Sequence, residues 1–212
     1  MNQADVKVAI CIPTRELMHS RCSFSLYNLA IELSAYNIEH RLFLSPGTLI
    51  ANQRHELVKV AKEWGATHVM FIDSDIVFEP SHVISLIEFN EPIVGAAYSK
   101  RIEPLITTAW HKIGDWSTHV VLTEQTDSHI QVEAMALGFC LIKTSVFGEL
   151  ELPWFILGFH NGEYTGEDIE FFRKCLAADI PVWLDVKTSL EIGHLGIKEY
   201  KNSDDVSVSF AT

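Results

Sequence analysis

At 212 residues the chain has room for one globular domain with a sizeable hydrophobic core. Its residues are 48% hydrophobic and 21% charged, a balance that argues against global disorder. The formal net charge of -12 argues against a protein that binds nucleic acid through a wide phosphate-binding surface, but it leaves room for one nucleotide pocket.

The four cysteines, Cys11, Cys22, Cys140 and Cys175, form no CxxC pair and have apolar or helical neighbours. We therefore expect buried or free thiols in a reducing compartment. The first residues, MNQADVKVAICIPT, lack a basic segment followed by a long apolar stretch, and no segment approaches the roughly 20 apolar residues that cross a bilayer. These features predict a cytoplasmic protein without stable membrane insertion.

The first half of the chain alternates between strand and helix patterns. Strands are predicted at 6–12, 39–44, 68–72 and 92–97, and helices at 23–36, 51–64 and 81–89. Strands separated by helices indicate right-handed crossovers and a parallel sheet, whose ligands bind beyond the carboxyl ends of the strands. Because the polar segments 13–16 and 73–75 each follow a predicted strand, we expect them to share a site.

The second half has a different pattern. Short antiparallel strands are predicted at 106–110, 119–122 and 130–134, further strands at 137–143 and 182–185, and a helix at 167–178. The spacing of apolar residues predicts an inner helix face made of Ile169, Phe172, Leu176 and Ala177. The polar, serine-rich segment 198–212 is expected to be a mobile tail.

The motif Asp73-Ser74-Asp75 places two carboxylates one residue apart, directly after a buried apolar strand. Two ionised carboxylates at the edge of a cleft cost free energy unless a cation compensates, and a hard divalent ion with oxygen ligands would do so. Such an ion could bridge to a diphosphate and assist its departure. The local sequence leaves a simpler alternative open, an Asx-type turn or the cap of the next helix.

Two acids, Glu167 and Asp168, open the amphipathic helix after Gly166. They either stabilise the first helical turn, where acids are favoured, or include a general base that takes a proton from a sugar hydroxyl. The positive end of the helix is expected to lower the pKa of that base.

Three further residues carry weaker signals. His194, between Gly193 and Leu195-Gly196, lies in backbone that could approach a ligand closely and could bind a metal through a ring nitrogen. Asn52 and Arg54 lie at the start of a predicted helix, where the guanidinium could pair with phosphate oxygens. An ordinary polar histidine and a solvated helical arginine remain open as alternatives.

Taken in order, several segments resemble the GT-A glycosyltransferases, especially those like family 2. The segments are AICIPTRE, ANQRHELVKVAKEWGATHVMFIDSD, IVGAAYSKR, ALGFCLIK, YTGEDIEFFRKCLAADIPVWLD and IGHLG, and they span nearly the whole chain. The resemblance implies an α/β fold of GT-A (Rossmann-like) type, a three-layer sandwich with a mostly parallel central sheet and a smaller antiparallel part in the C-terminal half. It implies a single domain over 1–212, with a nucleotide-binding half at 1–100 and an acceptor and catalytic half at 101–197.

The resemblance also implies roles for matching positions. Asp75 would bind Mn²⁺ or Mg²⁺ directly with His194, while Asp73 would face the ribose or a metal-bound water. Asp168 would be the base, with Glu167 as its neighbour. The donor site would comprise Pro13, Thr14, Arg15, Asn52, Arg54, Asp73, Ser74, Asp75 and Gly138. The acceptor side would comprise Trp154, Lys100 and Arg101, although a solvated surface position is an equal alternative for the last two.

The function implied by this resemblance is transfer of a sugar from a UDP- or GDP-linked donor to a glycan or another hydroxyl-bearing acceptor, with inversion if Asp168 reaches the acceptor. A retaining mechanism stays open. The chain contains no QxxRW motif, which argues against a processive polysaccharide synthase. The alternatives are a nucleotidyltransferase, whose glycine- and lysine-rich loop is not found at residues 13–16, and a nucleotide-sugar-binding module that needs no base.

Overall fold

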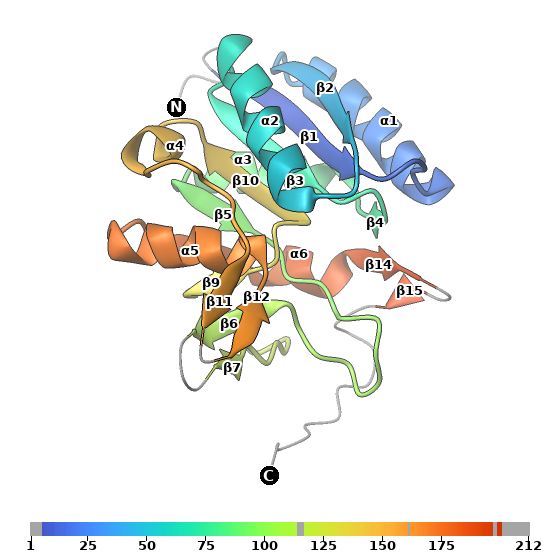
Figure 1. Ribbon diagram of the computed structural model, residues 1–212. Coiled ribbons are helices and arrows are strands. Elements are labelled where there is room, and N and C mark those ends of the chain that lie inside the picture. Colours follow the sequence, from blue (N-terminus) through green and yellow to red (C-terminus); the bar gives the residue numbers. More distant parts are fainter. Residues whose placement is uncertain (1–5, 114–116, 161, 197–198, 201–212) are drawn as a thin grey trace.

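A computed structural model describes residues 6–113, 117–160, 162–196 and 199–200. A seven-stranded sheet runs through its centre in the order β2-β1-β3-β10-β5-β13-β8 (Figure 1). Five of these strands run in one direction: β1 (Lys7–Thr14), β2 (Glu39–Pro46), β3 (His68–Ile72), β5 (Ile93–Gly95) and β13 (Val182–Asp185). The two antiparallel members are β10 (Phe139–Lys143) and β8 (His129–Gln131). The prediction of a mostly parallel central sheet is therefore confirmed.

Helices cover both faces of this sheet. One face packs against α1 (Ser20–Ala35) and α3 (Pro80–Phe89), and the other against α2 (Ile50–Glu63), α4 (Val146–Glu149) and α5 (Glu167–Ala177). The alternation of side chains along β1 supplies both cores, since Ile10 and Ile12 join the first and Ala9 and Cys11 the second. A strand buried on both faces is mostly apolar, as β1 is between Val8 and Pro13 and β3 between Val69 and Ile72.

Three small antiparallel sheets flank the central one. The strand β6 (Ala109–Lys112) pairs with β7 (Thr118–His119) and β9 (Ala134–Met135), and β11 (Gly158–His160) pairs with β12 (Glu163–Thr165). The strand β14 (Gly193–Leu195) lies between β4 (Ile76–Val77) and β15 (Glu199–Tyr200), after the short helix α6 (Val186–Glu191). The expectation of short antiparallel strands in the C-terminal half is confirmed. Apart from β15, the expected tail at 198–212 lies outside the described residues.

The inner face of α5 agrees with the prediction in part, because Phe172 is buried and Ile169 packs against the core. Its buried apolar residues are Phe171, Phe172 and Cys175, whereas Leu176 is 48% exposed. The reason is aromatic packing, because the ring of Phe171 stacks on that of Phe155 with centroids 5.1 Å apart.

All four cysteines are free and buried, as expected. Burial raises the pKa of the Cys22 and Cys175 thiols to about 12, so neither is a reactive thiolate at neutral pH. Within the part of the chain that the structure describes, no helix combines the length and apolar character required to cross a membrane.

Candidate functional site

A cavity of about 570 Å³ lies where β1 and β3 end, at the carboxyl edge of the parallel sheet. The structure brings six of the predicted donor-site residues together in its wall: Pro13, Thr14, Arg15, Asp73, Ser74 and Asp75. Arg101, predicted on the acceptor side, lines the same cavity. This placement follows the general rule that ligands of open α/β sheets bind outside the carboxyl ends of the strands.

The turn after β2 also contributes to this cavity, which sequence reasoning missed. The residues not predicted are Leu17, Gly47, Thr48, Ile50 and Gln53. Gln53 is buried, and its Nε2 donates to the carbonyl oxygens of Thr14, at 2.6 Å, and Ser45. This side chain thus joins the ends of β1 and β2. The Ser-Pro-Gly turn at 45–47 was the available signal, since it follows a predicted parallel strand at the same edge of the sheet.

Asp73 is held from several sides. Its backbone N–H donates to the Gly138 carbonyl at 2.8 Å, while its Oδ1 accepts from Arg54 at 3.0 Å and its Oδ2 from the Tyr98 hydroxyl at 3.2 Å. Burial, followed by the nearby Asp73 charge, raises the pKa of Tyr98 well above its usual value, so the phenol remains a donor. A Cβ at Gly138 would overlap both Tyr98 Oη and Asp73 Oδ2. Only glycine fits there, which explains why the predicted Gly138 lies directly against Asp73.

Arg54, a predicted donor-site residue, is buried and bonded to other groups of the protein. It is 2% exposed, and its guanidinium donates to Asp73 Oδ1 at 3.0 Å and to Glu167 Oε1 at 3.1 Å. A third contact reaches the Leu137 carbonyl at 3.4 Å. Each of the three guanidinium nitrogens therefore donates to a protein oxygen. Arg54 is a positioning residue that joins the motif at residues 73–75 to the acidic pair at the start of α5.

Asp75 and His194 are brought together by the pairing of β4 with β14. His194 lies opposite Ile76 in the register, and the Leu195 N–H donates to the Asp75 carbonyl at 2.8 Å. The His194 Nε2 consequently lies 3.8 Å from Asp75 Oδ1. The short strand pair explains how a histidine far along the chain reaches the carboxylate of Asp75.

The tautomer of His194 is defined by its second ring nitrogen. Nδ1 lies 2.9 Å from the Ser99 carbonyl, which can only accept, so Nδ1 carries the proton and Nε2 presents a lone pair. Burial, with a contribution from the Arg101 charge, lowers the pKa of His194 and favours this neutral form. A neutral imidazole oriented by a backbone carbonyl is the usual form of a metal-binding histidine.

Asp75 and His194 offer donor atoms of a type that can bind a divalent ion, but two protein donors are fewer than such an ion needs. Among the described residues, no group of three or more His, Cys, Asp and Glu side chains is arranged to hold a metal. Asp75, whose side chain is 30% exposed, and His194 Nε2 remain as two donors facing one another. An ion held by one carboxylate and one imidazole would take its remaining ligands from substrate phosphates and water.

Asp168 lies in the first turn of α5, after the cap residue Gly166. Burial, with a further contribution from the Glu167 charge, raises the pKa of Asp168 to about 6, against the lowering expected from the helix end. The helix effect is present as a hydrogen bond from the Ile169 N–H at 2.8 Å, but desolvation outweighs it. Asp168 is not among the described residues that line the cavity. It follows Glu167, which Arg54 joins to Asp73, so it lies one residue from a group connected to the motif at residues 73–75.

The predicted acceptor residues do not gather in one place. Trp154 is 6% exposed and its Nε1 donates to the Phe147 carbonyl at 3.0 Å, so it packs in the core and offers no face to an acceptor. Lys100 lies over the Trp110 ring, with Nζ 5.7 Å from the centroid. Only Arg101 reaches the cavity described above.

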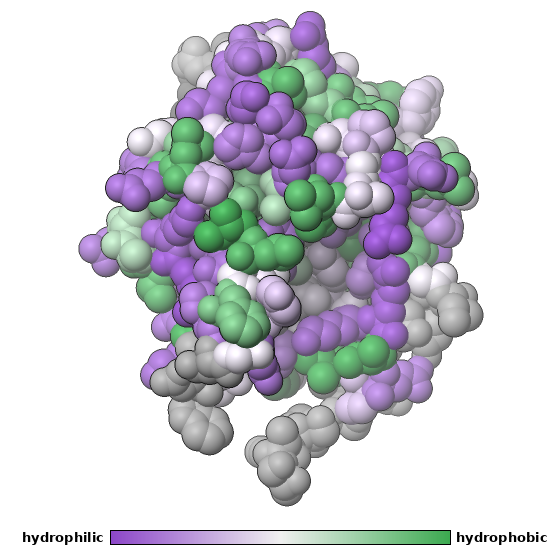
Figure 2. Space-filling view, in the orientation of Figure 1, coloured by the Kyte–Doolittle hydropathy of each residue, from purple (hydrophilic) through white to green (hydrophobic). Residues whose placement is uncertain are grey.

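A second cavity, of about 540 Å³, lies beside the first turn of α2 and includes the predicted donor residue Asn52. It is lined by Leu49, Ala51, Asn52, His55, Glu56, Pro153, Phe155, Ile156 and Leu157. Figure 2 shows hydrophobic residues gathered over the start of α2 and the segment before β11, where Leu49 and Leu157 are both more than half exposed. Asn52 therefore faces a different cavity from that of Asp73 and Asp75.

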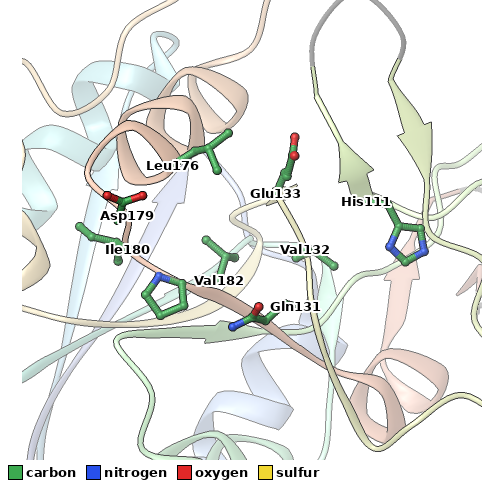
Figure 3. A pocket seen from close by; sticks show the side chains of 9 residues that line it. His111, Gln131, Val132, Glu133, Leu176, Asp179, Ile180 and Val182 are labelled. Atoms are coloured by element: carbon green, nitrogen blue, oxygen red, sulfur yellow. The ribbon is translucent and has the colours of Figure 1, made fainter.

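A third cavity, of about 440 Å³, lies between the end of α5 and the start of β13. Figure 3 shows Glu133, Asp179 and His111 around it. None of the predicted site residues is in its described lining, and it lies at the amino end of β13 rather than at a carboxyl end. Its position separates it from the cavity lined by Asp73, Ser74 and Asp75.

Neither a protein-family model nor a curated protein sequence matches this chain. Among solved structures, the crystal structure of A197 from STIV matches with a TM-score of 0.58 and 18% sequence identity, and the match covers 97% of this chain and 99% of that one. A likeness at this level of identity shows a shared fold over almost the full length of both chains. It carries no statement about activity.

Two other solved structures match more distantly. One is a glycosyltransferase involved in the glycosylation of the major capsid of PBCV-1, with a TM-score of 0.36, 10% identity, and coverage of 70% of this chain and 69% of that one. The other is HddC from Yersinia pseudotuberculosis complexed with GMP-PN, with a TM-score of 0.34, 9% identity, and coverage of 81% and 99%. Scores this low support no argument about fold or reaction.

Proposed function

We propose that this chain is a glycosyltransferase of the GT-A class that transfers a sugar from a nucleotide-diphosphate sugar to an acceptor hydroxyl. The donor would be UDP- or GDP-linked, and the acceptor a glycan or another hydroxyl-bearing molecule. Asp75 and His194 would hold Mn²⁺ or Mg²⁺, and Asp168 would act as the base. This assignment joins the sequence resemblance to the arrangement of the site.

One observation carries the proposal: the DxD aspartates, the histidine of β14 and the acidic pair of α5 meet at one edge of the sheet. Asp75 lies 3.8 Å from His194, and Arg54 bridges Asp73 to Glu167. These groups come from four separate parts of the chain. Their meeting beside a cavity of about 570 Å³ suits a nucleotide better than a turn or a helix cap, the simpler explanations of each motif alone.

The donor would lie along the cavity wall formed by the ends of β1 and β3, with its diphosphate toward Asp75. The bound ion would supply charge neutralisation for the departing diphosphate. Arg54 would keep Asp73 in place through their buried ion pair. Tyr98 fixes the other oxygen of Asp73, so the wall of the donor site is rigid before a ligand arrives.

Asp168 is suited to remove the acceptor proton. Its pKa of about 6 lies closer to neutral pH than that of an ordinary aspartate, which makes the carboxylate a stronger base while leaving it mostly ionised at pH 7. As the acceptor oxygen bonds to the anomeric carbon, the bond from that carbon to the diphosphate oxygen breaks. The hydroxyl proton passes to the Asp168 carboxylate. Attack from the face opposite the leaving group would invert the anomeric configuration.

The proposal is tested by a screen of UDP- and GDP-sugars for thermal stabilisation and for donor hydrolysis, each with Mn²⁺ and with EDTA. A ligand at 100 times its Kd stabilises the folded state by about 2.7 kcal/mol. We expect one donor to stabilise the protein only with Mn²⁺, and the Asp75→Ala variant to lose this effect. A Glu88→Ala variant, which removes an exposed acid of α3, is the matched control.

The same screen separates the alternatives. Release of pyrophosphate from a nucleoside triphosphate and a sugar phosphate would instead assign a nucleotidyltransferase. Donor binding without hydrolysis or transfer to any hydroxyl acceptor would assign a binding module. If a donor stabilises the protein equally in Mn²⁺ and in EDTA, donor binding does not require a metal.

A further inference from the structure

The guanidinium of Arg101 lies between the two side chains that would hold the ion. Its Nη2 hydrogen-bonds to Asp75 Oδ2, and its Nε and Nη2 lie 3.0 and 2.6 Å from His194 Nε2. Because Nδ1 of His194 carries the proton, Nε2 accepts from the guanidinium through its ring lone pair. The same lone pair would be needed to bind a metal.

Arg101 and a metal ion therefore exclude one another at His194 Nε2. A nitrogen with a single lone pair in the ring plane cannot accept from an N–H and coordinate an ion at the same time. The side chains of Arg101 and Asp75 are 42% and 30% exposed, and ion pairs with this much solvent contact contribute little to stability. The Arg101–Asp75 ion pair consequently contributes little free energy, so a metal ion can replace the guanidinium at small cost.

The loop that carries Arg101 is anchored at its two ends. Ser99 and Thr107 form an isolated antiparallel β-bridge, and the Lys100 N–H donates to the Ile106 carbonyl at 2.8 Å. Between these anchors Arg101 and Ile102 are exposed. The guanidinium can therefore move while the neighbouring strands stay paired.

We propose that the Arg101 guanidinium occupies the position between Asp75 and His194 as long as no ligand is bound. A divalent ion replaces it there only when a diphosphate is present and the guanidinium can bind to the phosphate oxygens instead. Arginine forms bidentate hydrogen bonds with phosphate oxygens, so a bound diphosphate offers Arg101 new partners as the ion takes its place. Metal and nucleotide then bind cooperatively, and free metal binds weakly. This inference rests on the proposed function, since it concerns the same site.

The test measures Mn²⁺ affinity, by calorimetry and by the electron paramagnetic resonance of free Mn²⁺, without nucleotide and with UDP or GDP. The proteins are the wild type, Arg101→Gln and Lys59→Gln. Lys59 pairs with Glu56 on the exposed side of α2, so its variant has the same change in net charge away from the site. Thermal unfolding of each variant verifies that it is folded.

Without nucleotide, we expect Arg101→Gln to bind Mn²⁺ about five-fold or more tightly than the wild type and Lys59→Gln, because the competing cation is gone. With UDP or GDP, the wild type should gain Mn²⁺ affinity and Arg101→Gln should gain much less. Equal Mn²⁺ affinity of the wild type and Arg101→Gln without nucleotide overturns the proposal.

The outcomes also separate this inference from the proposed function. Tighter Mn²⁺ binding by Arg101→Gln, in a protein that transfers and hydrolyses no nucleotide sugar, would support the role of Arg101 and reject the glycosyltransferase. Mn²⁺-dependent transfer with unchanged Mn²⁺ affinity of Arg101→Gln would do the reverse. If neither the wild type nor either variant binds Mn²⁺, with or without nucleotide, both the role of Arg101 and the metal-dependent glycosyltransferase are rejected.

Discussion

Arg54 and Asp73 form an ion pair of 3.0 Å in which the arginine side chain is 2% exposed. The other side of the same guanidinium lies 3.1 Å from Glu167, so one buried cation holds the donor motif and the acidic pair of α5 at a set separation. The rigidity of the site depends on this cation. Burial alone would lower the pKa of Arg54, but the charges of Asp73 and Glu167 outweigh it and raise the pKa, so the guanidinium stays charged.

Replacing Arg54 with Ala should destabilise the fold by about 3–5 kcal/mol, because it leaves the Asp73 and Glu167 carboxylates in a partly desolvated site without their partner. Urea unfolding measures the change. Lys59→Ala removes an exposed ion pair with Glu56 and should cost no more than about 0.5 kcal/mol. A loss for Arg54→Ala no larger than that of the control would show that the bridge has no structural role.

Replacing Asp168 with Asn should leave donor affinity unchanged while transfer falls by about 10²- to 10⁴-fold, the usual contribution of a general base. Donor affinity is measured by calorimetry with UDP or GDP and Mn²⁺, and transfer by product formation. The wild-type rate should decline as pH falls through about 6, where Asp168 takes up a proton. Retention of full transfer by Asp168→Asn would remove this residue as the base.

The raised pKa of Asp168 also predicts an effect on stability. Burial raises the pKa from 3.8 to about 6, so the folded state binds the proton more tightly than the unfolded state does. The stabilisation that comes with the proton is full below about pH 4 and is lost as pH rises through about 6. At about 1.4 kcal/mol per pKa unit, Asp168→Asn should be more stable than the wild type at pH 8 by up to about 3 kcal/mol. An unfolding series from pH 4 to 8 measures this difference, and parallel pH profiles for both proteins would argue against it.

A side chain at Gly138 should displace its neighbours. An added Cβ would overlap Tyr98 Oη and Asp73 Oδ2, so Gly138→Ala should displace Asp73, cost about 1–3 kcal/mol and weaken binding of UDP or GDP. Gly148, in α4, has open space where its Cβ would lie, and Gly148→Ala should be neutral or stabilising by up to about 1 kcal/mol. Similar stability of the two variants, measured by thermal unfolding, would show that Gly138 is not closely packed.

Much of the central sheet could be predicted from sequence because each element carries its own local pattern. The strands β3 and β13 have the predicted bounds, since apolar runs bounded by turns define them. The hairpin of β11 and β12 was not predicted, because Phe159 and Tyr164 are exposed and their segment lacks an apolar alternation that faces the core. The antiparallel insertion of β10 between β3 and β5 depends on partners far along the chain, which no local pattern encodes.

The candidate site also has features that local sequence predicts and features that depend on distant parts of the chain. Asp73 and Asp75 could be placed at a ligand-binding edge because they follow a parallel strand. The roles of Arg54 and Trp154 could not, since a sequence does not distinguish a buried arginine or tryptophan from one that faces a ligand. The position of Arg101 between Asp75 and His194 is a contact across three segments and required the structure.

The most direct test of the account is a crystal structure of the protein soaked with Mn²⁺ and UDP or GDP, with anomalous diffraction recorded to locate manganese. We predict an anomalous peak between the Asp75 carboxylate and His194 Nε2, in contact with the diphosphate, with the Arg101 guanidinium displaced from that position. A nucleotide bound in the cavity without manganese at Asp75, or manganese bound only elsewhere, would contradict it.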